Sequence, residues 1–173
     1  MSKAFNVIHT VSDLLDWLDN ESEATSKIFA ALTDASLKQA VADNHRTIGR
    51  MAWHLVQTIP EMSSKMGLKA AGPSDHDPVP TSAAAIKSAY DSAVASLKSE
   101  IKKNWNDETL KKEDDMYGSM WSRSFSMTIL LTHEIHHRGQ MTVLMRQAGL
   151  KVPGIFGPSY EEWDAYGMKP PAV

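Results

Sequence analysis

Apolar residues recur along most of the chain at intervals of three and four, which is the period of an amphipathic helix. Four segments show this pattern and predict four long helices, at about 5–32, 44–66, 82–101 and 124–148. The third segment is the most regular, with apolar residues at spacings of four, four, three and four. No segment alternates with a period of two over the length of a strand, so the pattern predicts no β-structure.

Residues that favour helix termini mark several of the predicted ends. We expect Asp43 or Asn44 to cap the second helix and Thr81 or Ser82 to cap the third, because short polar side chains accept hydrogen bonds from free backbone amides. Pro60 lies inside the second segment, where its missing backbone donor is expected to kink that helix or end it early.

The end of the fourth helix is also marked. Gly149 is expected to end it, with Pro153 shortly beyond. Ser159 and Glu162 then form a capping-box pattern, which predicts a short helical stretch closed by Gly167.

Two long connectors separate the predicted helices. The first, at about 67–81, is rich in proline and is expected to be either a crossover or a functional lid. The second, 104–123, carries Trp105, Tyr117 and Trp121, which we expect to cover the core. Four amphipathic helices with two long connectors predict an all-α four-helix bundle, and the length of the connectors permits a crossover topology.

Composition narrows the possible functions. A length of 173 residues predicts one domain over 1–173, and a net charge of −3 without basic clusters argues against nucleic acid as a partner. The start of the chain has no signal-peptide pattern, and no apolar run is long enough to span a membrane, so we expect a cytoplasmic protein with no membrane partner. The absence of cysteine leaves histidine and carboxylate side chains as the plausible metal ligands.

Three of the seven histidines lie within residues 133–137, in the fourth predicted helix. His133 and His137 are four residues apart, so their side chains project from one face and can share a metal ion. His54 in the second predicted helix can supply a third nitrogen, because metal sites in bundles are built from facing helices. Such a site would keep positions open for water or substrate. His133 with His136 is a weaker alternative pair.

The segment 133–137 also matches the His-Glu-x-x-His pattern of zinc proteases. In that interpretation Glu134 is the general base and Glu161 or Glu162 is a distant third ligand. The longer form of the motif fails, because Gly139 is one place early and no histidine follows. A second Glu-x-x-His unit is also missing, which disfavours a di-iron oxidase.

Three phrases resemble the DinB/YfiT-like metalloenzymes. They are His-Glu-Ile-His-His-Arg-Gly-Gln (133–140), Leu-Met-Arg-Gln-Ala-Gly-Leu-Lys-Val-Pro-Gly (144–154) and Ile-Gly-Arg-Met-Ala-Trp-His-Leu (48–55). The resemblance implies a four-helix bundle in up-down-down-up order, with the crossover between helices two and three. It also implies a metal triad of His54, His133 and His137.

The same resemblance suggests chemistry and partners. Zinc or nickel is the expected divalent ion, and iron or manganese also fits. Relatives with known reactions are transferases and isomerases that use low-molecular-weight thiols, and a homodimer is plausible. We therefore expect a metal-dependent enzyme that activates water or such a thiol, as a transferase, isomerase or hydrolase acting on a small-molecule substrate.

Glu61 and Gln140 are candidates for proton transfer or for support of a ligand, although the sequence favours a solvated surface group for each. Two other hypotheses are kept. One is a metal-stabilised bundle without turnover, acting as a binding or stress-response protein. The other is a metal-free helical protein whose histidines only form hydrogen bonds.

Overall fold

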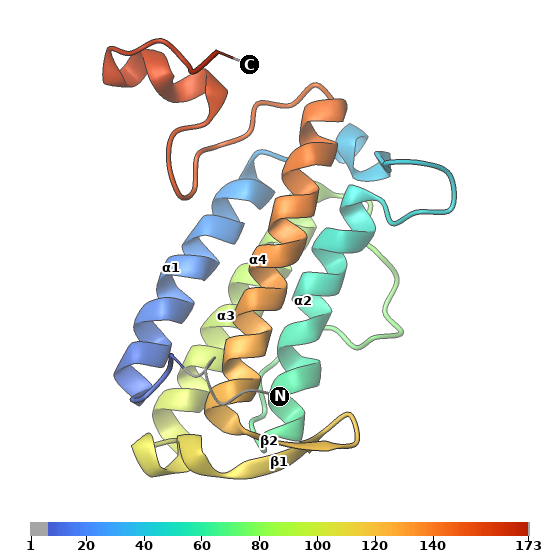
Figure 1. Cartoon of the computed structure of the whole chain (residues 1–173). Helices are drawn as coiled ribbons and strands as arrows, with labels where there is room; N and C mark the ends of the chain where they lie inside the picture. Colours follow the sequence, from blue (N-terminus) through green and yellow to red (C-terminus); the bar gives the residue numbers. More distant parts are fainter. Residues whose placement is uncertain (1–6, 173) are drawn as a thin grey trace.

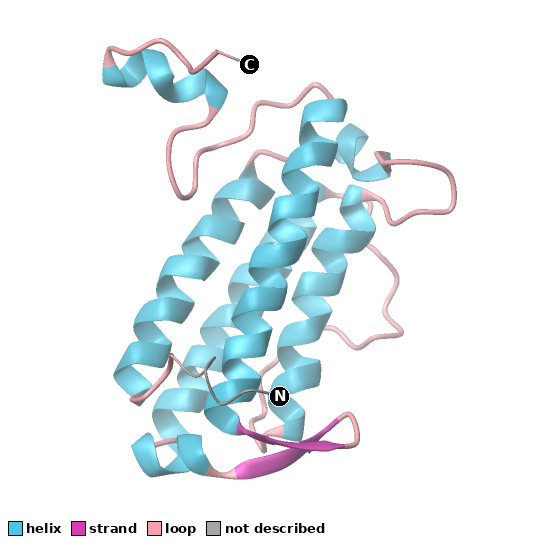
Figure 2. Ribbon diagram, in the orientation of Figure 1, coloured by secondary structure: helices cyan, strands magenta, loops and turns pink. Residues whose placement is uncertain are grey.

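Four long helices form the body of the protein. The structure is a computed structural model that describes residues 7–172. The helices are α1 (Val11–Ala30), α2 (Ile48–Lys65), α3 (Ala83–Asn104) and α4 (Arg123–Gln147). Along the colour gradient of Figure 1, α1 and α4 run upward while α2 and α3 run downward. The predicted all-α four-helix bundle and its up-down-down-up order are therefore confirmed (Figure 2).

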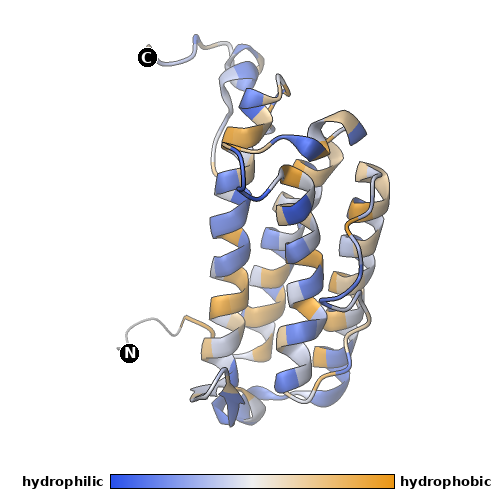
Figure 3. Cartoon of the chain, turned by 90° about the vertical axis from the view of Figure 1, so that its right-hand side faces the viewer, coloured by the Kyte–Doolittle hydropathy of each residue, from blue (hydrophilic) through white to orange (hydrophobic). Residues whose placement is uncertain are grey.

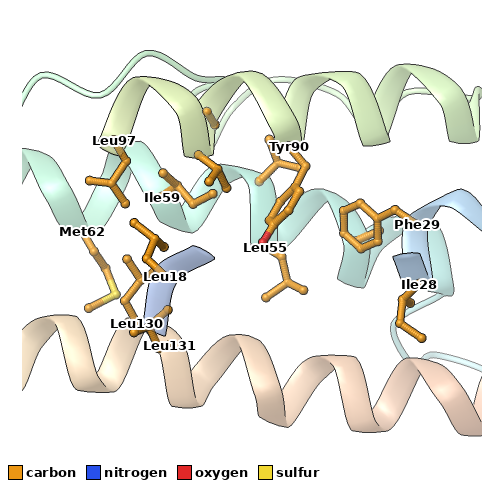
Figure 4. Packing of buried hydrophobic residues seen from close by; sticks show 14 of the residues in the cluster. Leu18, Ile28, Phe29, Leu55, Ile59, Met62, Tyr90, Leu97, Leu130 and Leu131 are labelled. Atoms are coloured by element: carbon orange, nitrogen blue, oxygen red, sulfur yellow. The ribbon is translucent and has the colours of Figure 1, made fainter. Parts of the chain in front are cut away.

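The four helices enclose one apolar interior. Helices α1 and α2 each pack against both α3 and α4, which places α1 and α2 at diagonal corners. Hydrophobic and hydrophilic residues are interspersed along each helix (Figure 3), as expected of amphipathic helices. Side chains from all four helices point into the same interior, among them Leu18, Leu55, Leu97 and Leu130 (Figure 4).

The connector between α2 and α3 runs back along the outside of α2. The indole Nε1 of Trp53 donates to the backbone oxygen of Asp77 at 3.1 Å. The side-chain amide nitrogen of Gln57 donates to the backbone oxygen of Ser74 at 2.6 Å. Hydrogen bonds at two successive turns of α2 tie the connector to the helix. This segment is the predicted crossover, which allows α3 to run parallel to α2 (Figure 1).

Two predicted starts differ from the structure. The predicted start of the first helix at Phe5 lies outside the described residues, and α1 begins only at Val11 because Thr10 and Asp13 form a capping box. Helix α2 is capped by Thr47, whose side chain accepts from the amide of Arg50, and not by Asp43 or Asn44. Ser82 caps α3 as predicted. In the capping box predicted for the final helical stretch, the carboxylate of Glu162 accepts from the backbone amide of Ser159, whereas the Ser159 hydroxyl forms no hydrogen bond.

Pro60 does not end α2 early, because the helix continues to Lys65. The turn that follows is held by burial, since Met62 and Met66 are both part of the core. The crossover also lies directly against the proline: a side-chain carbon at Gly72 would lie only 2.9 Å from Pro60 Cγ. Packing on both sides therefore offsets the single backbone hydrogen bond that proline removes.

The connector between α3 and α4 contains a short 3₁₀-helix, η3 (Asp107–Lys111), and a hairpin that the sequence pattern did not predict. Strands β1 (Glu113–Met116) and β2 (Ser119–Ser122) pair in antiparallel fashion. Tyr117 and Gly118 form the turn with φ of 60° and 84°, the left-handed conformation that tight hairpins use. Four-residue strands are too short to show a period-two pattern, and β1 is mostly acidic.

The aromatic residues of this connector have different roles. Trp105 is buried in the core and Trp121 packs against it, as predicted. Tyr117 is 59% exposed, so the prediction that it covers the core is wrong. The hairpin turn carries the phenol outward, toward the end of α2 and away from the bundle interior.

Two short 3₁₀-helices complete the fold: η2 (Asp34–Lys38) before α2, and η4 (Tyr160–Tyr166) near the end of the chain. Gly149 follows α4 and Gly167 follows η4, and both have positive φ, as helix-terminating glycines do. The segment with η4 extends away from the bundle (Figure 1). Within residues 7–172, no helix combines the length and the apolar character that crossing a membrane requires.

Candidate metal centre

The three histidines singled out in the sequence meet between α2 and α4. The Nε2 atom of His133 lies 3.1 Å from Nε2 of His54 and 3.1 Å from Nε2 of His137. Each side chain offers one nitrogen, and all three nitrogens lie within 4.8 Å of one another. Among the described residues, these three form the only such group of histidine and carboxylate side chains.

The spacing of the nitrogens fits ligands of one ion. Two nitrogens bound to Zn²⁺ at about 2.0–2.1 Å lie about 2.9 Å apart at a right angle and about 3.3 Å apart at a tetrahedral angle. The observed 3.1 Å lies between these values. Hydrogen bonding explains the cluster less well, because the single Nε2 of His133 can donate or accept only one hydrogen bond in the ring plane.

Gln140 fixes the orientation of one imidazole. Its side-chain oxygen lies 2.7 Å from Nδ1 of His137, one turn earlier on α4. With the proton on Nδ1, the lone pair of Nε2 points into the cluster, as a ligand requires. His133 lacks this support, because its buried Nδ1 has no hydrogen-bond partner.

The environment keeps the cluster uncharged. Burial, followed by the neighbouring His133 and the guanidinium of Arg46, lowers the pKa of His54 from 6.5 to about 4. Burial and the adjacent histidines lower the pKa of His133 to about 4, and burial also lowers the pKa of His137. At neutral pH all three imidazoles are therefore neutral and have lone pairs for a metal.

These shifts predict a pH dependence of the metal-free protein. Between about pH 4 and pH 6.5 the unfolded chain binds more protons than the folded one, so stability should fall as the pH falls through this range. Urea denaturation at about pH 7 and about pH 5 measures the loss. His54→Gln should lose less stability than the wild type between these two pH values. The substitution removes one histidine with a lowered pKa, and it removes a neighbouring charge from the cluster when the pH falls. An equal loss in both proteins would contradict the prediction.

The other candidate residues lie away from the cluster. His136 is exposed and lies outside the group of three histidines, so the structure does not favour its pairing with His133. Glu161 forms an ion pair with Arg146, and Glu162 accepts from backbone amides. Neither carboxylate belongs to the cluster, and the zinc-protease interpretation lacks its third ligand.

The side chain of Glu134 points to α1 and α3 and not to the histidine cluster. Its Oε1 accepts hydrogen bonds from Thr25 of α1 and Tyr90 of α3, each at 2.5 Å. One turn later, Arg138 forms an ion pair of 2.6 Å with Glu21 and also donates to Thr25. This buried polar network holds α4 against α1 and α3. Glu134 therefore has a structural position and not that of a general base at the cluster.

A pocket of about 540 Å³ opens beside the histidines. His54 and His133 line it together with polar residues from four segments. These are Arg50, Thr58 and Glu61 of α2, Arg46 of the preceding loop, Asp75 of the crossover and Tyr117 of the hairpin. Glu61 lies in this pocket and accepts from the phenol of Tyr117 at 2.7 Å, so it is not a free surface group.

The sequence analysis gave no role to the arginines of this pocket and placed Tyr117 over the core. Arg50 precedes His54 by four residues on α2, a spacing that identifies it as a neighbour on one helical face, whereas Arg46 lies ahead of the helix. Tyr117 had no such signal, since it reaches the pocket from an unpredicted hairpin turn.

A crossover four-helix bundle with three histidines between α2 and α4 defines a class of helical proteins that can bind a divalent metal. The family model of the DinB family matches residues 1–170, and the chain belongs to this family. Protein YrdA of Bacillus subtilis (strain 168), itself uncharacterized, is 41% identical over 167 residues, which cover 96% of this chain and 100% of YrdA.

Solved structures agree with this assignment. A DinB-like protein from Bacillus cereus ATCC 10987 is 41% identical, with a TM-score of 0.84 over 87% of this chain and 100% of the other. YfiT from Bacillus subtilis, described as a probable metal-dependent hydrolase with an unusual four-helix bundle topology, shares the fold. Its TM-score is 0.61 at 14% identity, over 86% of this chain and 90% of YfiT.

Proposed function

We propose that this protein is a divalent-metal-dependent enzyme that acts on a small molecule, with His54, His133 and His137 as the metal ligands. The proposal rests on the convergence of three Nε2 atoms from two facing helices, at a spacing that one ion explains better than hydrogen bonding does. The adjoining pocket of about 540 Å³ has the size of a small-molecule site.

The chain contributes three uncharged nitrogen donors and an open side. Neutral imidazoles favour zinc or nickel over magnesium or calcium, which prefer oxygen ligands. When bound, such an ion supplies Lewis acidity, which lowers the pKa of a water or thiol that it meets. His54 and His133 line the pocket, so a substrate in the pocket would lie beside an ion that the three histidines hold. Hydrolysis and thiol transfer or isomerisation are the reactions we propose. YfiT, the probable metal-dependent hydrolase, favours the first of these.

The open side of the site gives a direct test. Metal-free protein is reconstituted with Co²⁺, and its visible absorption is followed while azide or a small thiol such as 2-mercaptoethanol is added. We expect saturable changes in the spectrum, because an exchangeable position accepts these ligands. A cobalt spectrum that neither ligand changes would identify a metal-stabilised bundle without turnover, and failure to take up cobalt would identify a metal-free protein.

Gln140 is expected to act as a positioning residue for His137. Gln140→Ala removes the hydrogen bond to Nδ1, and the affinity for Zn²⁺ should fall about 10-fold to 100-fold. Competition with a chromophoric chelator measures this affinity. Gln147→Ala is the matched control, because it removes a glutamine at the end of the same helix, beyond the cluster. Equal Zn²⁺ affinity in Gln140→Ala and the wild type would contradict the prediction.

A further inference from the structure

Two arginines line the pocket on the same face as His54. Arg50 lies one turn before His54 on α2, and Arg46 lies another four residues earlier, just ahead of the helix. Thr58 and Glu61 continue the lining in the other direction. The pocket therefore has a cationic end and an acidic end, with the histidine cluster between them.

The pocket also holds two carboxylates, Glu61 and Asp75, and among the described residues neither forms an ion pair with an arginine. Glu61 is neutralised within the protein. Glu61 accepts a hydrogen bond from Tyr117 at 2.7 Å and lies 3.7 Å from the ammonium group of Lys65. The same ammonium group lies over the ring of Tyr117. The charge of Glu61 thus has partners in the chain, and no ligand is needed to balance it.

The arginines at the cationic end have no carboxylate partner within residues 7–172. The chain has five arginines, and Arg123, Arg138 and Arg146 each form an ion pair with a carboxylate. Arg46 and Arg50 form none with any residue that the structure describes. The two arginines without a carboxylate partner are therefore the two that line the pocket.

Arg50 is held in place by a neutral partner. Its Nη1 donates to the side-chain oxygen of Gln57 at 3.0 Å. Gln57 is buried, and its amide nitrogen donates to the backbone oxygens of Ser74 and Asp77 in the crossover. This chain of contacts orients the guanidinium without neutralising it, and its other N–H groups remain for a ligand.

Arg46 lines the same pocket as His54 and His133. Two guanidinium groups beside neutral imidazoles leave this side of the pocket with an excess of positive charge, and a divalent ion would increase the excess. An anionic ligand would restore the balance.

We propose that Arg46 and Arg50 form an oxyanion subsite, which binds a carboxylate or phosphate group of the substrate and places the rest of it beside His54 and His133. The assignment of this group to a substrate rests on the proposed function, whereas the binding of an anion by the two arginines does not. Guanidinium groups recognise both kinds of oxyanion through paired, charge-assisted hydrogen bonds.

The test uses metal-free, ¹⁵N-labelled full-length protein, so that an anion cannot bind through a metal. Acetate and inorganic phosphate are titrated separately at constant ionic strength, balanced with chloride, and the Nε–H signals of the arginines are followed by NMR. We expect saturable shifts for Arg46 and Arg50 and none for Arg146, which is paired with Glu161. Tighter binding of acetate would assign a carboxylate group, and tighter binding of phosphate a phosphate group.

The double variant Arg46→Gln/Arg50→Gln should bind the preferred anion at least about tenfold more weakly. The affinity is measured from the chemical-shift changes of backbone amides in the pocket. Arg146→Gln is the matched control and should bind like the wild type. Circular dichroism confirms that each variant is folded. Absence of saturable shifts in the wild type, or unchanged affinity in the double variant, would overturn the subsite. Uptake of metal without these shifts rejects the subsite alone, and these shifts without uptake of metal reject the proposed metal function alone.

Discussion

His54→Ala is expected to lose nearly all bound metal. The wild-type protein, produced without a histidine tag, should hold roughly one equivalent of a divalent ion. His54 is the sole member of the cluster from α2, so its removal leaves only the two nitrogens of α4. Elemental analysis after extended dialysis measures the metal content of both proteins.

His136→Ala provides the matched control for this result. His136 lies on α4 next to His137, but its side chain is exposed and lies outside the cluster. The variant should keep a full equivalent of metal. Retention of metal in His54→Ala would reject the assignment of the ligands, and loss of metal in His136→Ala would point instead to the pairing of His133 with His136.

Arg138→Met is expected to lower the free energy of unfolding of the metal-free protein by about 3–5 kcal/mol. Arg138 and Glu21 are 3% and 5% exposed, and their side chains form an ion pair of 2.6 Å. Removal of the arginine leaves the carboxylate of Glu21 in the core with only the indole of Trp17 as a donor. Urea denaturation at neutral pH measures the loss.

Two further variants separate the buried charge from the loss of any arginine. Arg146→Met breaks an exposed pair with Glu161 and should cost no more than about 1 kcal/mol. The double variant Glu21→Leu/Arg138→Met removes both buried charges and should recover much of the stability of the wild type. Arg138→Met with the stability of Arg146→Met would show that the buried network does not hold α4 in place.

The four helices and the histidine cluster could be predicted because their signals are local. Apolar periodicity identifies a buried helical face, and the spacing of His133 and His137 places both imidazoles on one side of α4. His54 could be added because facing helices bring such groups together. The wrong helix starts have a physical cause too: several short polar residues precede α1 and α2, and apolar periodicity alone does not select Thr10 and Thr47 as the caps.

The features that could not be predicted depend on contacts between distant residues. Glu21 and Arg138 are separated by 117 positions, and no periodicity in the sequence relates them. Glu134 illustrates the limit most clearly, because its place in a metalloprotease pattern suggests a general base, whereas its carboxylate accepts hydrogen bonds from Thr25 of α1 and Tyr90 of α3. The hairpin that brings Tyr117 to Glu61 likewise follows from folding of the connector and not from a strand pattern.

Three imidazoles should hold one divalent ion, with a position on the ion left for a ligand from the pocket. X-ray absorption spectroscopy at the metal edge of the stoichiometrically loaded protein can establish this, because it identifies the ligands of the ion itself. We predict three imidazole ligands and a remaining light-atom ligand that is replaced by sulfur when 2-mercaptoethanol is added. Two or fewer imidazoles, or a coordination shell that the thiol leaves unchanged, would contradict the account.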